Sequence, residues 1–264
     1  MTGADVGPDA SGSSPGRKLS QFLPRETVAG IIAIAALALA WHLASIYGPS
    51  YAFPTWGRIA RALINIPLQD VGISIARLAV SMLLSFVIGM IFSTLVFERP
   101  FVEALLLPLV RLLMAVPAVC WVIFAILWFK GVEFRIFFVM SIVCTPVFII
   151  DSLDAMKGVP LDLRQMVRSF RPDAVRYYTK LIFPSILPYV LTSWKINLTL
   201  AVRVVTIAEL VGAGSGIGHG LVIAQEMFSI AEVFAWTVVL VLILLALQGL
   251  VNVIERRTLH WRTA

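Results

Sequence analysis

Charged and polar residues interrupt a long apolar stretch in the second half of the chain. Lys195, Asn197, Arg203 and Glu209 lie within residues 186–210, which are otherwise predominantly apolar. A basic side chain at the centre of a bilayer costs roughly 2.5–3.5 kcal/mol, so it needs a partner or a function. Lys195 and Arg203 share nearly one helix face, whereas Glu209 falls on another and is expected to find its partner on a different helix. Three interpretations follow: a polar pathway for an anionic solute, an interhelical hydrogen-bond network, or a Lys195 side chain that extends to the cytoplasmic interface.

The chain carries no residue pattern that is typical of an enzyme. There is no His-Glu-x-x-His pair, no Gly-x-Ser-x-Gly elbow and no Gly-x-x-x-x-Gly-Lys-Ser/Thr phosphate loop. The glycine-rich residues 212–220 lack the Gly-x-Gly-x-x-Gly spacing of a dinucleotide site, so we expect a bent connector or a break in a helix there. Cys120 and Cys144 lie in apolar runs and are expected to be small buried residues. We therefore predict a protein that is not itself an enzyme and that uses no cofactor or metal.

Composition indicates an integral membrane protein. Hydrophobic residues make up 59% of the 264 residues and charged residues 14%, whereas a soluble domain has roughly 25% charged residues. Six apolar runs are candidate membrane spans: about 27–47, 71–97, 102–129, 134–150, 186–210 and 233–254. The third run contains Pro108 and Pro117, which predict bends. Residues 1–20 have no apolar pattern and are expected to form a disordered tail, followed by one transmembrane domain over residues 21–264.

The distribution of basic residues predicts the orientation in the membrane. With six spans, 13 of the 21 Lys and Arg residues fall on the side of the two termini and 4 on the opposite side. Because cytoplasmic loops are enriched in Lys and Arg, both termini are expected in the cytoplasm. The net charge of +6 is explained in the same way, without a nucleic-acid partner. We predict a multi-pass protein of the cell membrane.

A polar segment from Asp151 to Pro188 separates the fourth and fifth runs and holds six of the basic residues. Two amphipathic patterns lie in it: Leu163, Met166, Val167 and Phe170, then Val175, Tyr178, Leu181 and Ile182. Pro172 is expected to stop the first helix and Asp173 to cap the second, which Pro184 and Pro188 would end. Two short helices, apolar on one face and basic on the other, are expected to form a docking platform for a second protein; the alternative is a solvated loop along anionic lipid.

This segment resembles the cytoplasmic loop of the binding-protein-dependent ABC importer permeases. Gln165-Met166-Val167 stands at the family's Glu-Ala-Ala, Arg171 at its Gly, and Leu181-Ile182-Phe183-Pro184 at its Ile/Val-x-Leu-Pro-like end. Over about residues 22–262 the chain is most similar to the nitrate/sulfonate/taurine type. The matching motifs are Phe53-Pro54-Thr55, Ser74-Ile75-Ala76-Arg77-Leu78, Pro117-Ala118-Val119-Cys120-Trp121 with Leu127-Trp128-Phe129, Glu209-Leu210-Val211-Gly212 and Gly216-Ile217-Gly218.

The resemblance implies an all-α, type I importer-like permease with six transmembrane helices and a two-helix coupling loop over about residues 152–185. It implies an ABC ATPase subunit that hydrolyses ATP, an extracytoplasmic solute-binding protein and a second permease subunit, in a homodimer or a heterodimer. The residues expected to couple to the ATPase are Leu163, Arg164, Gln165, Met166, Val167, Arg168, Phe170, Arg171 and Asp173. Those expected along the translocation path are Arg77, Asn197, Arg203 and Glu209.

The resemblance also implies the kind of solute, a small organic or inorganic anion such as a sulfonate, taurine or nitrate. Two alternatives stay open from the sequence: a membrane scaffold that docks an ATPase without carrying solute, and an importer of a thiamine-precursor pyrimidine. Gln165 keeps the shape of the family's glutamate but not its charge, and Arg171 must make a turn that the family makes with glycine. We therefore expect altered contacts with the ATPase at these two positions.

Overall fold

The structure, a computed structural model, describes residues 25–49 and 52–259, and within these ranges it contains helices and turns without β-strands. The chain divides into two units, residues 1–53 and 54–264. In the first unit, α1 (Arg25–Tyr47) covers the first predicted span. The ring of Trp41 near its end packs edge to face on Phe53, with centroids 5.6 Å apart. The predicted tail of residues 1–20 lies outside the described residues.

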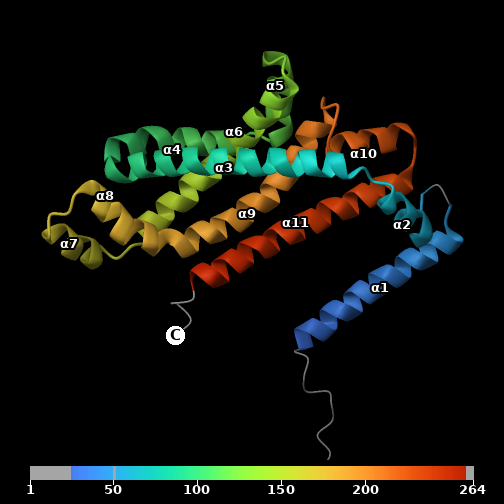
Figure 1. Ribbon diagram of the computed structural model, residues 1–264, viewed down its shortest axis with the longest axis horizontal. Coiled ribbons are helices and arrows are strands. Elements are labelled where there is room, and N and C mark those ends of the chain that lie inside the picture. The colour runs from blue at the N-terminus through green and yellow to red at the C-terminus, as the bar shows by residue number, and fades with distance from the viewer. Residues whose placement is uncertain (1–24, 50–51, 260–264) are drawn as a thin grey trace, which may run out of the picture. The chain divides into compact units, whose positions relative to one another are not determined.

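In the second unit, three long helices pack side by side: α3 (Leu68–Glu98), α6 (Val132–Lys157) and α9 (Phe183–Leu210) (Figure 1). The helix α11 (Ile230–Thr258) packs on α9 and on two short helices, α2 (Trp56–Ile64) and α10 (Ile217–Glu226). Helical backbone satisfies its own hydrogen bonds, which is required where no water is available. These helices confirm the second, fourth, fifth and sixth predicted spans.

The close packing of α3 on α6 follows from a row of small residues. Ser81, Ser85, Gly89 and Ser93 recur every four residues on α3, so they share one face, and all four are buried. A Cβ atom on Gly89 would lie 2.6 Å from the Cβ of Phe148 on α6. Helices approach this closely in membranes where small residues line the contact. The main core is built around this contact and includes Met82, Met140, Cys144, Phe148, Ala201 and Val205.

The third predicted span is two helices, α4 (Pro100–Ala115) and α5 (Ala118–Trp128), whose axes differ by 95°. Val116 between them is extended, with φ −79° and ψ 124°, because the residue before a proline is disfavoured in the helical region. Pro117 therefore makes the predicted bend, whereas Pro108 stays inside α4. Among the described residues, five helices are long and apolar enough to span a membrane, or six when α4 and α5 count as one broken span.

The polar segment after α6 forms two helices, but the second does not end where the sequence predicts. α7 (Leu161–Ser169) is separate, whereas α8 (Ala174–Tyr177) continues through a π-helical turn, Tyr178–Ile182, directly into α9. The prediction that Pro184 and Pro188 end this helix was wrong. Pro184 follows the π-helical turn by two residues, and Pro188 lies inside α9; a membrane helix accommodates prolines of this kind through local adjustments of its hydrogen bonds. Leu181 and Ile182 are buried whereas Val175 is exposed, so only the later part of the second predicted stripe packs on the body of the unit.

Candidate functional site

A buried charged cluster joins α3 to the far end of α9. Arg77 donates from Nη1 to Glu209 Oε1 at 2.8 Å, and from Nε to Glu133 Oε2 at 2.9 Å, with a further bond from Nη2 to the same carboxylate. Its other two N–H groups reach Ser215, at the carbonyl oxygen (2.8 Å) and at Oγ (3.1 Å). All five guanidinium donors are therefore used. Arg77 is 4% exposed and Glu209 is fully buried, whereas the side chain of Glu133 is 59% exposed.

The Glu209 carboxylate also holds the start of α10. It accepts a hydrogen bond from the Ser74 hydroxyl, which lies 2.8 Å from either oxygen, and one from the Gly218 N–H at 3.0 Å. The Ser74 Oγ in turn accepts the Ile217 N–H at 2.9 Å, and Asp70 Oδ1 accepts the Gly216 N–H at 2.9 Å. An anionic group beside the first N–H groups of a helix is stabilised by the helix dipole. The cluster thus fixes the glycine-rich segment against α3.

Two glycines make this approach possible. Gly216 has φ 104°, and a Cβ there would meet the Glu209 carboxylate. A Cβ on Gly218 would lie 2.5 Å from the Thr206 carbonyl oxygen. Only glycine adopts this backbone conformation without strain and leaves this space. The glycine-rich segment is therefore a tight connector, as its spacing predicts, and we name it with its carboxylate partner the Glu209 latch (Ser74, Arg77, Glu209, Ser215–Gly218).

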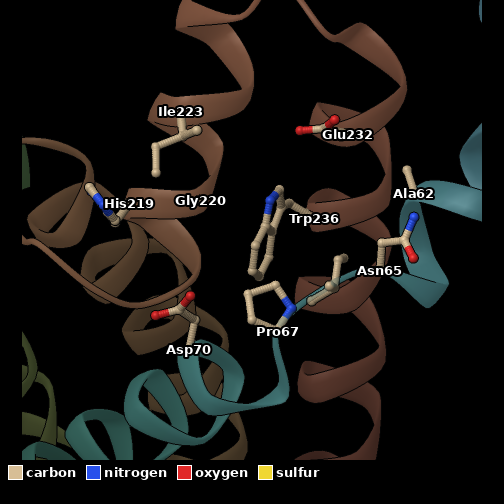
Figure 2. A pocket seen from close by; sticks show the side chains of 10 residues that line it. Ala62, Asn65, Pro67, Asp70, His219, Gly220, Ile223, Glu232 and Trp236 are labelled. Atoms are coloured by element: carbon tan, nitrogen blue, oxygen red, sulfur yellow. The ribbon is translucent and has the colours of Figure 1, made fainter.

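A cavity of about 290 Å³ lies next to the latch, between the α2–α3 connection, α10 and α11. Figure 2 shows the indole of Trp236 between the carboxyl groups of Asp70 and Glu232, with Asn65 and His219 at the margin. Trp236 is 5% exposed, and Gly220 packs against its ring so closely that a Cβ would collide with it. The cavity offers hydrogen-bond donors and acceptors. Asp70, which lines the cavity, also accepts the hydrogen bond from the Gly216 N–H. The wall of the cavity and the Glu209 latch therefore share this contact.

The structure brings together two of the four residues predicted along the translocation path. Arg77 and Glu209 are paired, which confirms that Glu209 finds its partner on another helix. Asn197 is buried on α9 and donates to the Ser193 carbonyl oxygen at 3.3 Å. Arg203 is exposed on α9 and lies apart from them. The path role of these residues stays a prediction.

Lys195, the other basic residue of α9, binds Glu255 of α11 in a partly exposed ion pair. This contact fits the second interpretation of the sequence for Lys195, an interhelical polar contact. Sequence reasoning missed three other polar residues. Glu133 lies in the first turn of α6, and Ser74 gives no signal of its own. Asp151 accepts the Ser193 hydroxyl at 2.6 Å, although the sequence places it in the polar segment.

The residues predicted to couple to an ATPase lie on α7 and the turn after it, and the helix has two distinct faces. Leu163, Met166 and Phe170 are exposed together on one face. On the other side the Arg164 guanidinium lies 5.6 Å from the ring centroid of Phe97, and that of Arg168 lies 5.1 Å from that of Tyr177. Such cation–π contacts hold the helix on the body of the unit.

The remaining predicted coupling residues complete this picture. Val167 packs inward on the core at the base of the segment, whereas Gln165 and Asp173 are exposed. Arg171, exposed as well, has φ 48°, the left-handed conformation that its glycine-like position requires. The predicted apolar stripe therefore divides, with Val167 facing the protein and the other three residues facing outward.

These features define a polytopic helical membrane protein with a charged latch in the helix bundle and an exposed amphipathic helix outside it. Residues 81–260 match the family described as "Binding-protein-dependent transport system inner membrane component". The chain belongs to this family and is a permease subunit of an ABC importer.

Curated relatives agree with this assignment. SsuC of Bacillus subtilis (strain 168), named as an aliphatic sulfonates transport permease protein, is 28% identical over 73% of this chain and 70% of its own length. The nitrate import permease protein NrtB and the bicarbonate transport system permease protein CmpB of Synechocystis sp. are 25% and 26% identical. Their alignments cover 84% and 85% of this chain, and 87% and 86% of the relatives.

Solved structures support the fold. A chain of the MetNI methionine ABC transporter in an inward-facing conformation superposes with a TM-score of 0.62 at 18% identity, covering 72% of this chain and 95% of that chain. At this identity the likeness concerns the fold alone. The all-α importer permease fold expected from the sequence is confirmed.

Proposed function

We propose that this permease subunit is driven by a separate ABC ATPase that docks on α7. The observation that carries the proposal is the exposed apolar face of α7: Phe170 is 79% exposed and Met166 56%. Apolar side chains on a helix that is itself held by stacked arginines are typical of a contact surface. Leu163 and Met166 would enter a cleft of the ATPase, and Arg164, Gln165, Val167, Arg168, Arg171 and Asp173 would position the helix.

The subunit would form the translocation path together with a second permease subunit. Arg203 supports this proposal, because it lies on an exposed stripe of α9 with Tyr189, Thr192 and Ile196, at spacings of three, four and seven residues that share one face. A charged residue exposed on a membrane-length helix needs a partner or an aqueous path. Arg77 and Glu209 neutralise each other, so we assign them to holding the latch, with Asn197 as a polar residue behind the path.

The solute would be a small anion delivered by an extracytoplasmic solute-binding protein. The names of the relatives support this class, because they refer to aliphatic sulfonates, nitrate and bicarbonate. The charge distribution supports a cytoplasmic position for α7 and for both termini. The latch and the cavity beside Trp236 would then lie near the opposite surface, where the binding protein docks.

The ATPase proposal is tested in vesicles that contain the permease, its ATPase and its binding protein. Phe170→Asp should abolish solute-stimulated ATP hydrolysis while the protein still inserts, because a carboxylate cannot enter an apolar cleft without a large desolvation cost. The matched control is Leu161→Asp. Leu161 is 63% exposed on α7, but it lies nine residues away and therefore on the opposite face. Wild-type stimulation in Phe170→Asp, or equal loss in both variants, would refute docking through this face.

The solute class is tested on the binding protein. We expect an alkanesulfonate, nitrate or bicarbonate to bind in a calorimetric titration, and a pyrimidine precursor of thiamine not to bind. Binding of the pyrimidine alone would overturn the anion proposal without affecting the assignment as a permease.

A further inference from the structure

A cavity of about 730 Å³ lies where α3 ends, opposite the turn between α7 and α8. Three arginines line it: Arg99 just after α3, Arg168 at the end of α7, and Arg171 in the turn. Glu98, Tyr177 and Tyr178 complete the polar wall. The cavity faces away from the exposed apolar side of α7, since Arg168 stacks on Tyr177 of the body.

The positive charge of this cavity is not balanced by the protein. Within residues 25–49 and 52–259, none of the three arginines forms an ion pair. Glu98 is the carboxylate among the lining residues, and it accepts the Tyr178 hydroxyl at 2.5 Å. Three guanidinium groups around one cavity repel one another and attract an anion from solution.

The backbone conformation of Arg171 also supports an anion-binding site in this cavity. Its φ of 48° is a conformation that costs an L-residue roughly 1–2 kcal/mol and that glycine adopts freely. Strain of this kind persists where surrounding contacts over-determine it, and it is concentrated at functional sites. At this position the strain places a third guanidinium on the wall of a cavity that already holds two.

The floor of the cavity identifies the source of the anion. Thr94 and Leu95 line it, and both lie within the candidate span Leu68–Glu98. Leu95 is 49% exposed, as expected for a side chain that faces lipid. The cavity therefore runs from the lipid-facing side of a span up to a cluster of guanidinium groups. A soluble partner would contact only the arginines, whereas a lipid would contact the arginines through its headgroup and Leu95 through an acyl chain.

We propose that this cavity binds an anionic phospholipid, with the headgroup phosphate between Arg99, Arg168 and Arg171 and an acyl chain along Leu95. Guanidinium groups bind phosphate oxygens through paired, charge-assisted hydrogen bonds. The lipid would connect the end of α3 to the segment that carries α7. The proposal goes beyond the ATPase-docking function and does not depend on it.

The test uses the full-length chain, purified in a neutral detergent and titrated with phosphatidylglycerol or phosphatidylcholine, with bound lipid measured by native mass spectrometry. We expect phosphatidylglycerol to bind about tenfold more tightly, and Arg99→Gln and Arg171→Gln each to reduce this preference by about 3–10-fold, as for the loss of one charge-assisted bond. The control is Lys180→Gln, which removes one exposed positive charge of the same segment outside the cavity and should leave the preference unchanged. Arg171→Gly removes the charge and relieves the backbone, so it keeps the test valid if Arg171→Gln does not fold.

Three results would overturn the proposal. The first is equal binding of both lipids, and the second is equal loss in Lys180→Gln and the arginine variants. The third is displacement of phosphatidylglycerol by inorganic phosphate at comparable concentration, which would identify a free anion as the ligand. If the arginine variants lose ATPase stimulation but keep the lipid preference, these arginines act on the ATPase and not on a lipid, which also refutes the lipid site. Failure of the Phe170→Asp test leaves these measurements unaffected.

Discussion

Arg77→Met tests whether the Glu209 latch is a true buried ion pair. Methionine keeps much of the side-chain length but removes the cation that is bonded 2.8 Å from Glu209 Oε1. Glu209 is fully buried, so its carboxylate would be left with the Ser74 hydroxyl and the Gly218 N–H and no positive charge at bonding distance. Removing one partner of a buried pair costs about 3–5 kcal/mol, because an uncompensated charge remains. We expect a loss of that size in the free energy of unfolding.

Glu133 provides a control for this experiment, because it is the second carboxylate that binds the Arg77 guanidinium. Glu133 also binds Arg77, but its side chain is 59% exposed, and water screens such a pair. Glu133→Gln should therefore cost at most about 1 kcal/mol. The two carboxylates differ in burial while they share one partner, so the difference between the variants measures the effect of burial.

The double variant Arg77→Met/Glu209→Gln completes the experiment. It removes the orphaned charge that Arg77→Met creates, so we expect it to recover about 2 kcal/mol relative to the single variant, within the usual range of coupling for residues in contact. Reversible unfolding in mixed detergent micelles, followed by tryptophan fluorescence, gives the free energies. Equal losses in Arg77→Met and Glu133→Gln, or a double variant less stable than Arg77→Met, would refute the description of the latch.

Three further predictions concern single positions. Gly216→Ala should destabilise the protein by about 1–3 kcal/mol, because Gly216 has a φ of 104° and an added Cβ would meet the Glu209 carboxylate. Gly214 has open space around it, so Gly214→Ala should change the free energy of unfolding by less than about 0.5 kcal/mol in the same assay. Arg171→Gly should be more stable than Arg171→Ala by about 1 kcal/mol in the free energy of unfolding, because only glycine adopts the left-handed conformation without strain. It should therefore also melt at a higher temperature, and equal melting temperatures would contradict this. Arg203→Ala should reduce solute uptake into vesicles more than Lys195→Ala, because Lys195 is engaged in an ion pair and Arg203 is exposed; wild-type uptake in both would remove Arg203 from the path.

The membrane spans could be predicted from sequence because length and hydropathy are local properties. The observed bounds of α3 and α11 differ from the predicted runs by no more than four residues. The fourth run was predicted to stop at Ile150, yet α6 continues to Lys157. Asp151 lowers the local hydropathy, but its carboxylate accepts a bond from α9, so a polar residue that reads as a boundary is an internal contact.

The details that decide the sites depend on contacts between distant residues. The six-residue spacing of Arg203 and Glu209 predicts a partner for Glu209 on another helix, but it cannot identify Arg77, which lies 132 positions earlier. The exposed and buried sides of α7 were not separable either. Val167 shares the apolar stripe with Met166, and only the position of Tyr177 and Phe97 on neighbouring elements determines which side faces the protein.

One helix connects the two functional regions of the permease. α9 has 28 residues, so it is about 42 Å long at 1.5 Å per residue. Its first end continues from α8 without a loop, and its last turn carries Glu209, which is bonded to α3 and to the start of α10. In the proposed function, a force that reaches α8 would be carried by backbone hydrogen bonds along α9 to the latch. The π-helical turn Tyr178–Ile182 interrupts the α-helical hydrogen-bond pattern of this connection, and such turns are common where a helix serves a function. In the proposed function, α8 and the Glu209 latch would lie at the two ends of one continuous helix, so we expect that weakening the latch changes how far a docked ATPase moves the latch end of α9.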